Sequence, residues 1–130
     1  MDYETTFSAI LSLRSYDDSV LGLADALDYE VLERNLIGEP RGKLGKQALK
    51  ENRLVYTVRP DVTGYVESVV AEVAERAAAL SAPTLATFKK CHPWLVVRLL
   101  DPNFVELHFD QETVAKLADV GLAVSVENRT

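Results

Sequence analysis

Regular alternation between apolar and other residues in residues 3–14 is the feature that most constrains the fold of this chain. A period of two is typical of a β-strand that has one face in the protein core and the other toward solvent. The apolar face would carry Phe7, Ala9, Leu11 and Leu13, and the opposite face Ser8, Ser12 and Arg14. We therefore expect a sheet that is covered on one face.

Further segments with strand or helix patterns follow in an order that indicates an α+β domain. Strands are expected at residues 29–37, 54–58, 95–99, 105–109 and 122–126. Helices are expected at about 18–27, at 60–80, in a short stretch after 81–83, and at 111–120. The order β-α-β-β-α-(α)-β-β-α-β predicts a single domain over residues 1–130, with a mostly antiparallel sheet of about six strands and helices packed on one face.

Capping residues and apolar stripes support the predicted helices. Pro60 and Asp61 are expected to open the longest helix, whose buried stripe begins at Val62. Asp110 is an expected N-cap for the last helix, and Gly121 is its expected C-terminal stop. The inward-facing residues of this last helix are predicted to be Val114, Leu117 and Ala118.

A hairpin is expected between residues 95 and 109. The turn would be formed by residues 101–103, with Asn103 in the left-handed region. This register places Leu95 by Phe109, Val97 by Leu107 and Leu99 by Val105 on the inner face. It also sets Arg98 opposite Glu106 on the outer face.

Composition limits the classes of protein to which the chain can belong. A 130-residue chain with 48% apolar and 26% charged residues has the balance of an ordinary globular domain. Its single cysteine excludes an internal disulfide, its N-terminus lacks a secretion signal, and no apolar run approaches the roughly 20 residues of a membrane span. We therefore expect a cytoplasmic protein without membrane association. The net charge of −6 argues against nucleic-acid binding.

Positive charge is concentrated in one stretch of this acidic chain. Residues 34–59 carry seven of the fourteen basic residues and have a local net charge of +5, whereas residues 1–33 have a net charge of −7. The centre of the stretch, residues 38–52, contains three glycines and a proline, which predicts a long loop without the spacing of a P-loop. We expect a non-enzymatic domain that contacts an acidic protein partner through this loop. The predicted contact residues are Arg41, Lys43, Lys46 and Lys50.

Two motifs of the chain resemble a known family. The run from Ile37 to Gly42, Ile-Gly-Glu-Pro-Arg-Gly, resembles a loop of a family of short bacterial proteins, about 130 residues long, that is catalogued as a domain of unknown function. The stretch from Leu107 to Val126 resembles the ending of the same family, in which a strand leads into a helix, a glycine and a final strand. The resemblance implies a cytoplasmic α+β domain, and for proteins of this kind a toxin-neutralising, immunity-type role.

A second hypothesis is a small-molecule binder or weak enzyme with a groove between sheet and helices. Arg34 or Arg59 would hold an anionic group there, and Tyr56 and Trp94 would line the groove. A concave pocket in which these residues converge would favour this hypothesis over protein binding. Self-association through a sheet edge is a further alternative.

The sequence shows no catalytic, metal or cofactor motif. Cys91, His92 and His108 lack the spacing of a metal site, and we expect Cys91 to be a small buried apolar residue. We therefore predict no bound cofactor.

Overall fold

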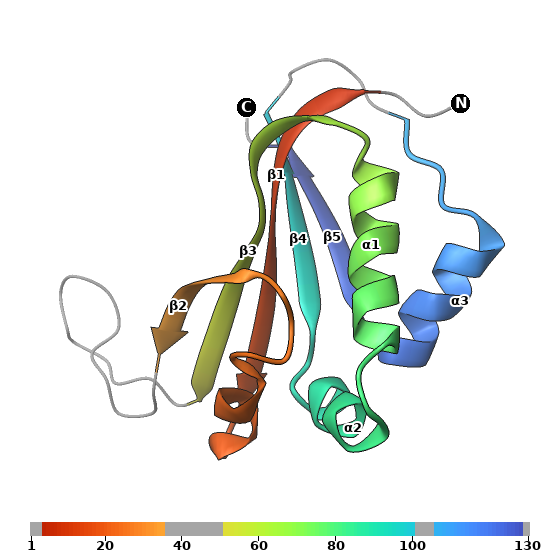
Figure 1. Ribbon diagram of the computed structural model, residues 1–130. Coiled ribbons are helices and arrows are strands. Elements are labelled where there is room, and N and C mark those ends of the chain that lie inside the picture. The colour runs from red at the N-terminus through yellow and green to blue at the C-terminus, as the bar shows by residue number, and fades with distance from the viewer. Residues whose placement is uncertain (1–3, 36–50, 101–105, 129–130) are drawn as a thin grey trace, which may run out of the picture.

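A computed structural model describes residues 4–35, 51–100 and 106–128. The fold is α+β, as predicted, and its helices gather on one face of a five-stranded sheet (Figure 1). The strands are β1 (Thr5–Ser15), β2 (Glu30–Asn35), β3 (Asn52–Gly64), β4 (Trp94–Leu99) and β5 (Ala123–Asn128). The helices are the 3₁₀ helix η1 (Asp18–Leu23) and the α-helices α1 (Val66–Ala78), α2 (Ala82–Lys90) and α3 (Gln111–Val120). No helix in the described part of the chain is long and apolar enough to cross a membrane.

Strand β1 lies at the centre of the sheet, whose strand order is β2-β3-β1-β4-β5. It pairs with β3 on one side and with β4 on the other, and both pairings are antiparallel. Strand β2 pairs antiparallel with β3 at one edge, whereas β5 pairs parallel with β4 at the other. The sheet is therefore mixed, and its longest strands are in the middle.

The hydrophobic core lies between the sheet and the helices. The predicted inner row of β1 is confirmed, because Phe7, Ala9, Leu11 and Leu13 are each at most 1% exposed. Helix α1 lies against this row and buries one stripe of its surface (Figure 1). That stripe consists of Val66, Val69, Val70, Val73, Ala74 and Ala77. Valine is a mediocre helix former, so packing against the sheet, rather than intrinsic propensity, holds α1 in place.

The predicted start of the longest helix is wrong. Residues 60–64 continue β3, and α1 begins only at Val66. The register of β1 against β3 shifts between Phe7 and Ala9, where residues 60 and 61 fall on the β3 side. A proline is tolerated at such an irregularity, because the ladder hydrogen bond that its missing N–H cannot donate is already absent there.

The predicted hairpin between residues 95 and 109 is also wrong. Strand β4 forms where expected, but residues 106–110 are not part of the sheet, and residues 101–105 lie outside the described residues. The parallel strand β5 takes the neighbouring position, so that Leu95 lies by Val124 and Val97 by Val126. Arg98 accordingly pairs with Glu127, 3.4 Å away, instead of Glu106. The sheet therefore has five strands within the described residues, against about six predicted.

Helix α3 has the predicted limits but a different buried face. Asp110 caps its start by accepting a hydrogen bond from the Thr113 N–H, and Gly121 ends it with a φ of 68°. Val114 and Ala118, which were predicted to face inward, are exposed. The more buried residues are Thr113, Lys116, Leu117 and Val120. The helix packs on α1, and that contact selects the face.

Two tyrosines at the same end of the core differ in how their hydroxyl groups are satisfied. The rings of Tyr29 and Tyr56 meet edge to face, 6.4 Å apart. The Tyr56 hydroxyl donates a hydrogen bond to the backbone carbonyl of Leu23, which ties η1 to β3. The Tyr29 hydroxyl is buried and has no hydrogen-bond partner among the described residues. Burial raises the pKa of each tyrosine to about 12.

This difference predicts opposite effects of the same substitution. Tyr56→Phe should lower the free energy of unfolding by about 1–2 kcal/mol, because it removes a buried hydrogen bond and leaves the Leu23 carbonyl unpaired. Tyr29→Phe should leave the free energy of unfolding unchanged or raise it by up to about 1 kcal/mol, because it removes a buried hydroxyl without a partner. Urea unfolding of both variants measures the difference. Equal losses in the two variants would contradict the hydrogen-bond assignment.

Candidate binding site on the helix-free face of the sheet

The face of the sheet opposite the helices carries the side chains that alternate with the core row of β1. Ser12 and Arg14 lie on this face, because their neighbours Leu11 and Leu13 point into the core. The register places Arg14 directly opposite Arg53 of β3, and Ser12 directly opposite Trp94 of β4. Three strands that are far apart in the sequence therefore bring these side chains together.

These residues surround a pocket of about 430 Å³, which we call the outer pocket. The chain segments that enter β4 and β5 complete its wall. It is lined by Ser12, Arg14, Arg53, His92, Pro93, Trp94, Gly121 and Ala123. The outer pocket therefore combines two guanidinium groups with an indole and an imidazole.

The two arginines of the outer pocket share one acidic neighbour, Glu51. Its Oε1 atom lies 3.5 Å from Arg53 Nη2 and 3.9 Å from Arg14 Nη1. Like charges directly opposite each other on paired strands destabilise a sheet, and this carboxylate reduces the repulsion. The Arg14 side chain is 51% exposed and that of Arg53 is 31% exposed, so both guanidinium groups remain accessible.

Trp94, the only tryptophan of the chain, lies open to solvent beside the arginines. It is 43% exposed, and its Nε1–H donates a 2.7 Å hydrogen bond to Ser125 Oγ on β5. This bond restrains the indole on the surface of the sheet. A large aromatic ring that is restrained but uncovered is a typical anchor for a binding partner.

His92 occupies a strained position at the margin of the outer pocket. Its φ of 49° lies in the left-handed region, which disfavours side chains with a Cβ. The residues on either side are fixed, because the Cys91 carbonyl accepts a hydrogen bond from Arg14 N–H and the Pro93 carbonyl accepts one from Ala123 N–H. Backbone strain of this kind is found most often at functional sites. The strain at His92 and the exposure of its imidazole therefore both support a functional role for the outer pocket.

Among the described residues, those predicted to line a ligand groove are not brought together in one place. Arg34 is exposed on the edge strand β2, and Trp94 lies on the helix-free face. Tyr56 is fully buried on the opposite, helix-covered side of the sheet. The predicted loop residues Arg41, Lys43, Lys46 and Lys50 lie outside the described residues.

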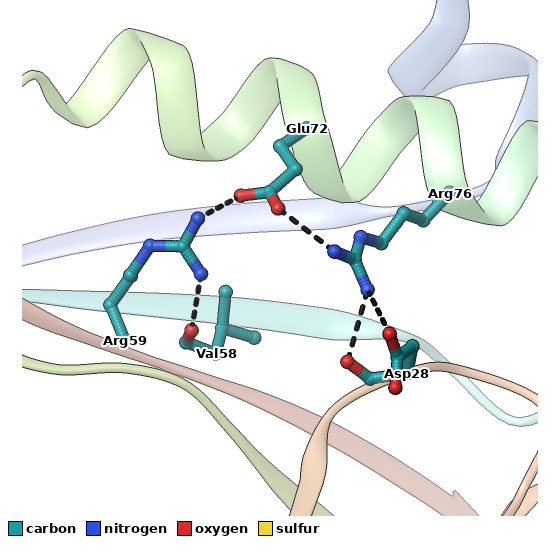
Figure 2. A network of polar contacts seen from close by, with 5 residues as sticks. All are labelled: Asp28, Val58, Arg59, Glu72 and Arg76. Carbon is teal, nitrogen blue, oxygen red and sulfur yellow. Dashed lines mark hydrogen bonds and ion pairs between the residues drawn. The ribbon is translucent and has the colours of Figure 1, made fainter.

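Arg59, the remaining predicted ligand-binding residue, belongs to a network that ties α1 to the sheet (Figure 2). Its guanidinium group donates to the Glu72 carboxylate and to the Val58 carbonyl. The other oxygen of Glu72 accepts a 3.2 Å hydrogen bond from Arg76, which also reaches the Asp28 carbonyl at 3.0 Å. Arg76 in addition lies over the Tyr29 ring, 4.6 Å from its centroid. The guanidinium group of Arg59 is thus engaged in contacts within the chain that connect β3 to α1.

Sequence reasoning missed Arg14 and Arg53 as site residues. Arg14 was visible as the last polar residue in the alternation of β1, and Arg53 as a member of the basic stretch. Nothing local to either position indicates that they face each other, because the pairing joins residues 39 positions apart.

Cys91 is fully buried, as expected, and burial raises the pKa of its thiol. Within the described residues, no group of three or more histidine, cysteine, aspartate or glutamate side chains is placed to hold a metal ion.

Comparisons of the chain with protein-family models, with curated proteins and with solved structures find no significant match.

The strain at His92 predicts that glycine is the more stable residue there. His92→Gly should raise the free energy of unfolding by about 0.5–1 kcal/mol, because glycine adopts a positive φ without a Cβ clash. Gly121→Ala is the reciprocal control, since Gly121 has a φ of 68°, and it should lower the free energy of unfolding by about 1 kcal/mol. Thermal and urea unfolding measure both changes. A less stable His92→Gly variant would show that the imidazole itself contributes to stability.

The network of Figure 2 predicts that Glu72 matters more than an ordinary surface carboxylate. Glu72→Gln should lower the free energy of unfolding by about 1 kcal/mol, because Arg59 and Arg76 both lose a charged acceptor. Glu112→Gln removes an acid that pairs only with Lys116 among the described residues, and it should cost less than about 0.5 kcal/mol. Urea unfolding at low and high salt measures both, and the Glu72 effect should shrink at high salt. Similar costs for the two variants would argue against the network.

Proposed function

We propose that this chain is a non-enzymatic binding domain that receives an acidic segment of a protein partner in the outer pocket. The observation that supports this most is the convergence of Arg14, Arg53 and Trp94 on one pocket of the helix-free face. Two guanidinium groups provide planar donors for a carboxylate, and the indole provides an apolar surface beside them. The acidic partner is the one expected from the sequence, and the proposed contact surface is now the outer pocket.

The openness of the lining residues favours a segment of a larger partner as the occupant. Pockets for small molecules bury most of the ligand surface, about 70–90%. Here Arg14, His92 and Trp94 are all exposed, so a ligand would remain largely open to solvent. A partner protein would bury such a surface in the interface, since its own surface extends beyond the bound segment. Arginine and tryptophan are enriched among the residues that contribute most of the binding energy in protein interfaces.

The basic stretch of residues 34–59 would add to the attraction of an acidic partner. Lys50 precedes Arg53 by three positions in the sequence, and Arg41, Lys43 and Lys46 precede it in the same stretch. Although these residues lie outside the described part, their charge belongs to the same region of the sequence. Charges near a binding site mainly accelerate association with an oppositely charged partner and add less to affinity.

A small anionic ligand is the second candidate, and the volume of the outer pocket favours it. About 430 Å³ falls within the range of ligand pockets, roughly 300–1,000 Å³. An aromatic carboxylate would use the same residues, with its charge on the arginines and its ring on Trp94. The sequence had placed such a ligand between sheet and helices, and the described residues support the opposite face instead.

Removal of the two arginines should abolish partner binding without unfolding the chain. We expect the wild-type protein to capture an acidic protein from a lysate of its native cells, and the double variant Arg14→Gln/Arg53→Gln to lose it. The double variant Arg98→Gln/Lys116→Gln removes the same charge away from the outer pocket and should retain the partner. Mass spectrometry of the captured proteins and melting temperatures of all three chains provide the readout. Equal capture by both double variants would place the contact elsewhere. Empty captures would favour the small ligand, which thermal shift with aromatic carboxylates tests directly.

A further inference from the structure

Glu51 lies where the carboxylate of a bound partner would be expected. A single oxygen, Oε1, faces the guanidinium groups of both arginines of the outer pocket. Its side chain is only 18% exposed, so it is more buried than the side chain of either arginine. The chain therefore contains its own acidic group in contact with the proposed anion site.

The contacts of Glu51 are loose for charged groups. Charge-assisted hydrogen bonds between guanidinium and carboxylate have lengths of about 2.7–2.9 Å. The separations here are 3.5 Å to Arg53 and 3.9 Å to Arg14, and neither pairing is bidentate. The arginines thus keep donors that a better-placed carboxylate can use, and a partly exposed ion pair of this kind contributes only about 0–1 kcal/mol.

We propose that Glu51 is an internal competitor, which the carboxylate of an acidic partner segment displaces from Arg14 and Arg53. This inference rests on the proposed function of the outer pocket. Displacement leaves the number of ion pairs at the arginines unchanged, so that the partner gains net affinity only from tighter geometry and from its contact with Trp94. A segment with a carboxylate alone would compete poorly, and selectivity for an acid beside an apolar residue follows.

The spacing between the arginines and Trp94 in the outer pocket indicates which residue pattern the partner segment would carry. Arg14 lies two residues beyond Ser12 on β1, and Ser12 lies opposite Trp94. Two residues of a strand span about 7 Å, which is also the separation of side chains i and i+2 on one side of an extended peptide. An extended segment with an acidic residue and an apolar residue at positions i and i+2 therefore matches the arginines and the indole. This motif is the ligand class that we assign to the outer pocket.

A simpler interpretation is that Glu51 only reduces the repulsion between the two arginines. Neutralising it would then strengthen binding of any anion by the general change in charge, and neutralising another acid on the same face would do the same. Glu127 provides that comparison, because it lies on β5 of the same sheet and pairs with Arg98 at 3.4 Å. Competition requires the effect to be specific to Glu51.

Tryptophan fluorescence tests the inference, because Trp94 is the only tryptophan of the chain and lines the outer pocket. The probe is a blocked peptide in which glutamate and leucine are separated by one serine, and the control peptide has glutamine in place of glutamate. The chains titrated are wild type, Glu51→Gln, Glu127→Gln and Arg53→Gln. Melting temperatures establish that each variant is folded at the temperature of the titration.

We expect Glu51→Gln to bind the glutamate peptide about fivefold more tightly than wild type, which corresponds to about 1 kcal/mol. Glu127→Gln should bind as wild type does, and Arg53→Gln should lose binding. Equal tightening in Glu51→Gln and Glu127→Gln, or no tightening in either, would overturn competition by Glu51 while leaving the proposed function intact. No preference for the glutamate peptide over the glutamine peptide in any chain, including Glu51→Gln, would overturn the proposed function itself.

Discussion

The register of the central strand β1 is the constraint on which the rest of the structure depends. Its inner row, which includes Phe7, Leu11 and Leu13, is buried almost completely and receives α1. A slip of one residue would exchange the two faces, placing Arg14 in the core and Leu13 in solvent. Burial of this row therefore sets the position of the outer pocket as well as that of the core, because both faces belong to the same strand.

The helices reach this sheet chiefly through apolar packing. Helix α1 presents a stripe of valines and alanines, which bury well but favour the helical state only weakly. The ion pair of Glu72 with Arg59 connects the helix to β3, and the ion pair of Arg76 with Asp28 connects it to the segment before β2 (Figure 2). Such partly exposed pairs contribute little individually, so they orient the helix more than they stabilise it. In the described part of the chain no helix covers the other face, where Arg14 and Trp94 of the outer pocket are exposed.

Several features that cost stability meet at the outer pocket. Arg14 and Arg53 lie opposite each other with the same charge, His92 has a positive φ, and Trp94 is uncovered. Each of these could be relieved by a simple substitution. Departures of this kind, gathered at one place on the surface, are characteristic of binding and catalytic sites. The proposed binding function rests on this convergence.

Local patterns predicted much of this fold correctly. The inner row of β1, the strand at Trp94–Leu99 and the limits of α3 follow from periodicity and capping, which act over a few neighbouring residues. The same local patterns misassigned residues 60–64, where a proline that resembles a helix start lies at a register shift of β3. They also misassigned residues 106–109, because an apolar run after a turn signal has the local pattern of a hairpin strand.

The sequence by itself determined the α+β class, the core face of β1 and the capped ends of α3, since these depend on hydrogen bonds and burial within one element. Only the tertiary structure decided that β5 lies parallel to β4, and that Arg14, Arg53 and Trp94 share a pocket. The physical reason is that strand pairing and register depend on which apolar faces of segments far apart in the chain are buried together. The side chains that form the site belong to strands that are paired in this way, so no local preference of theirs brings them together.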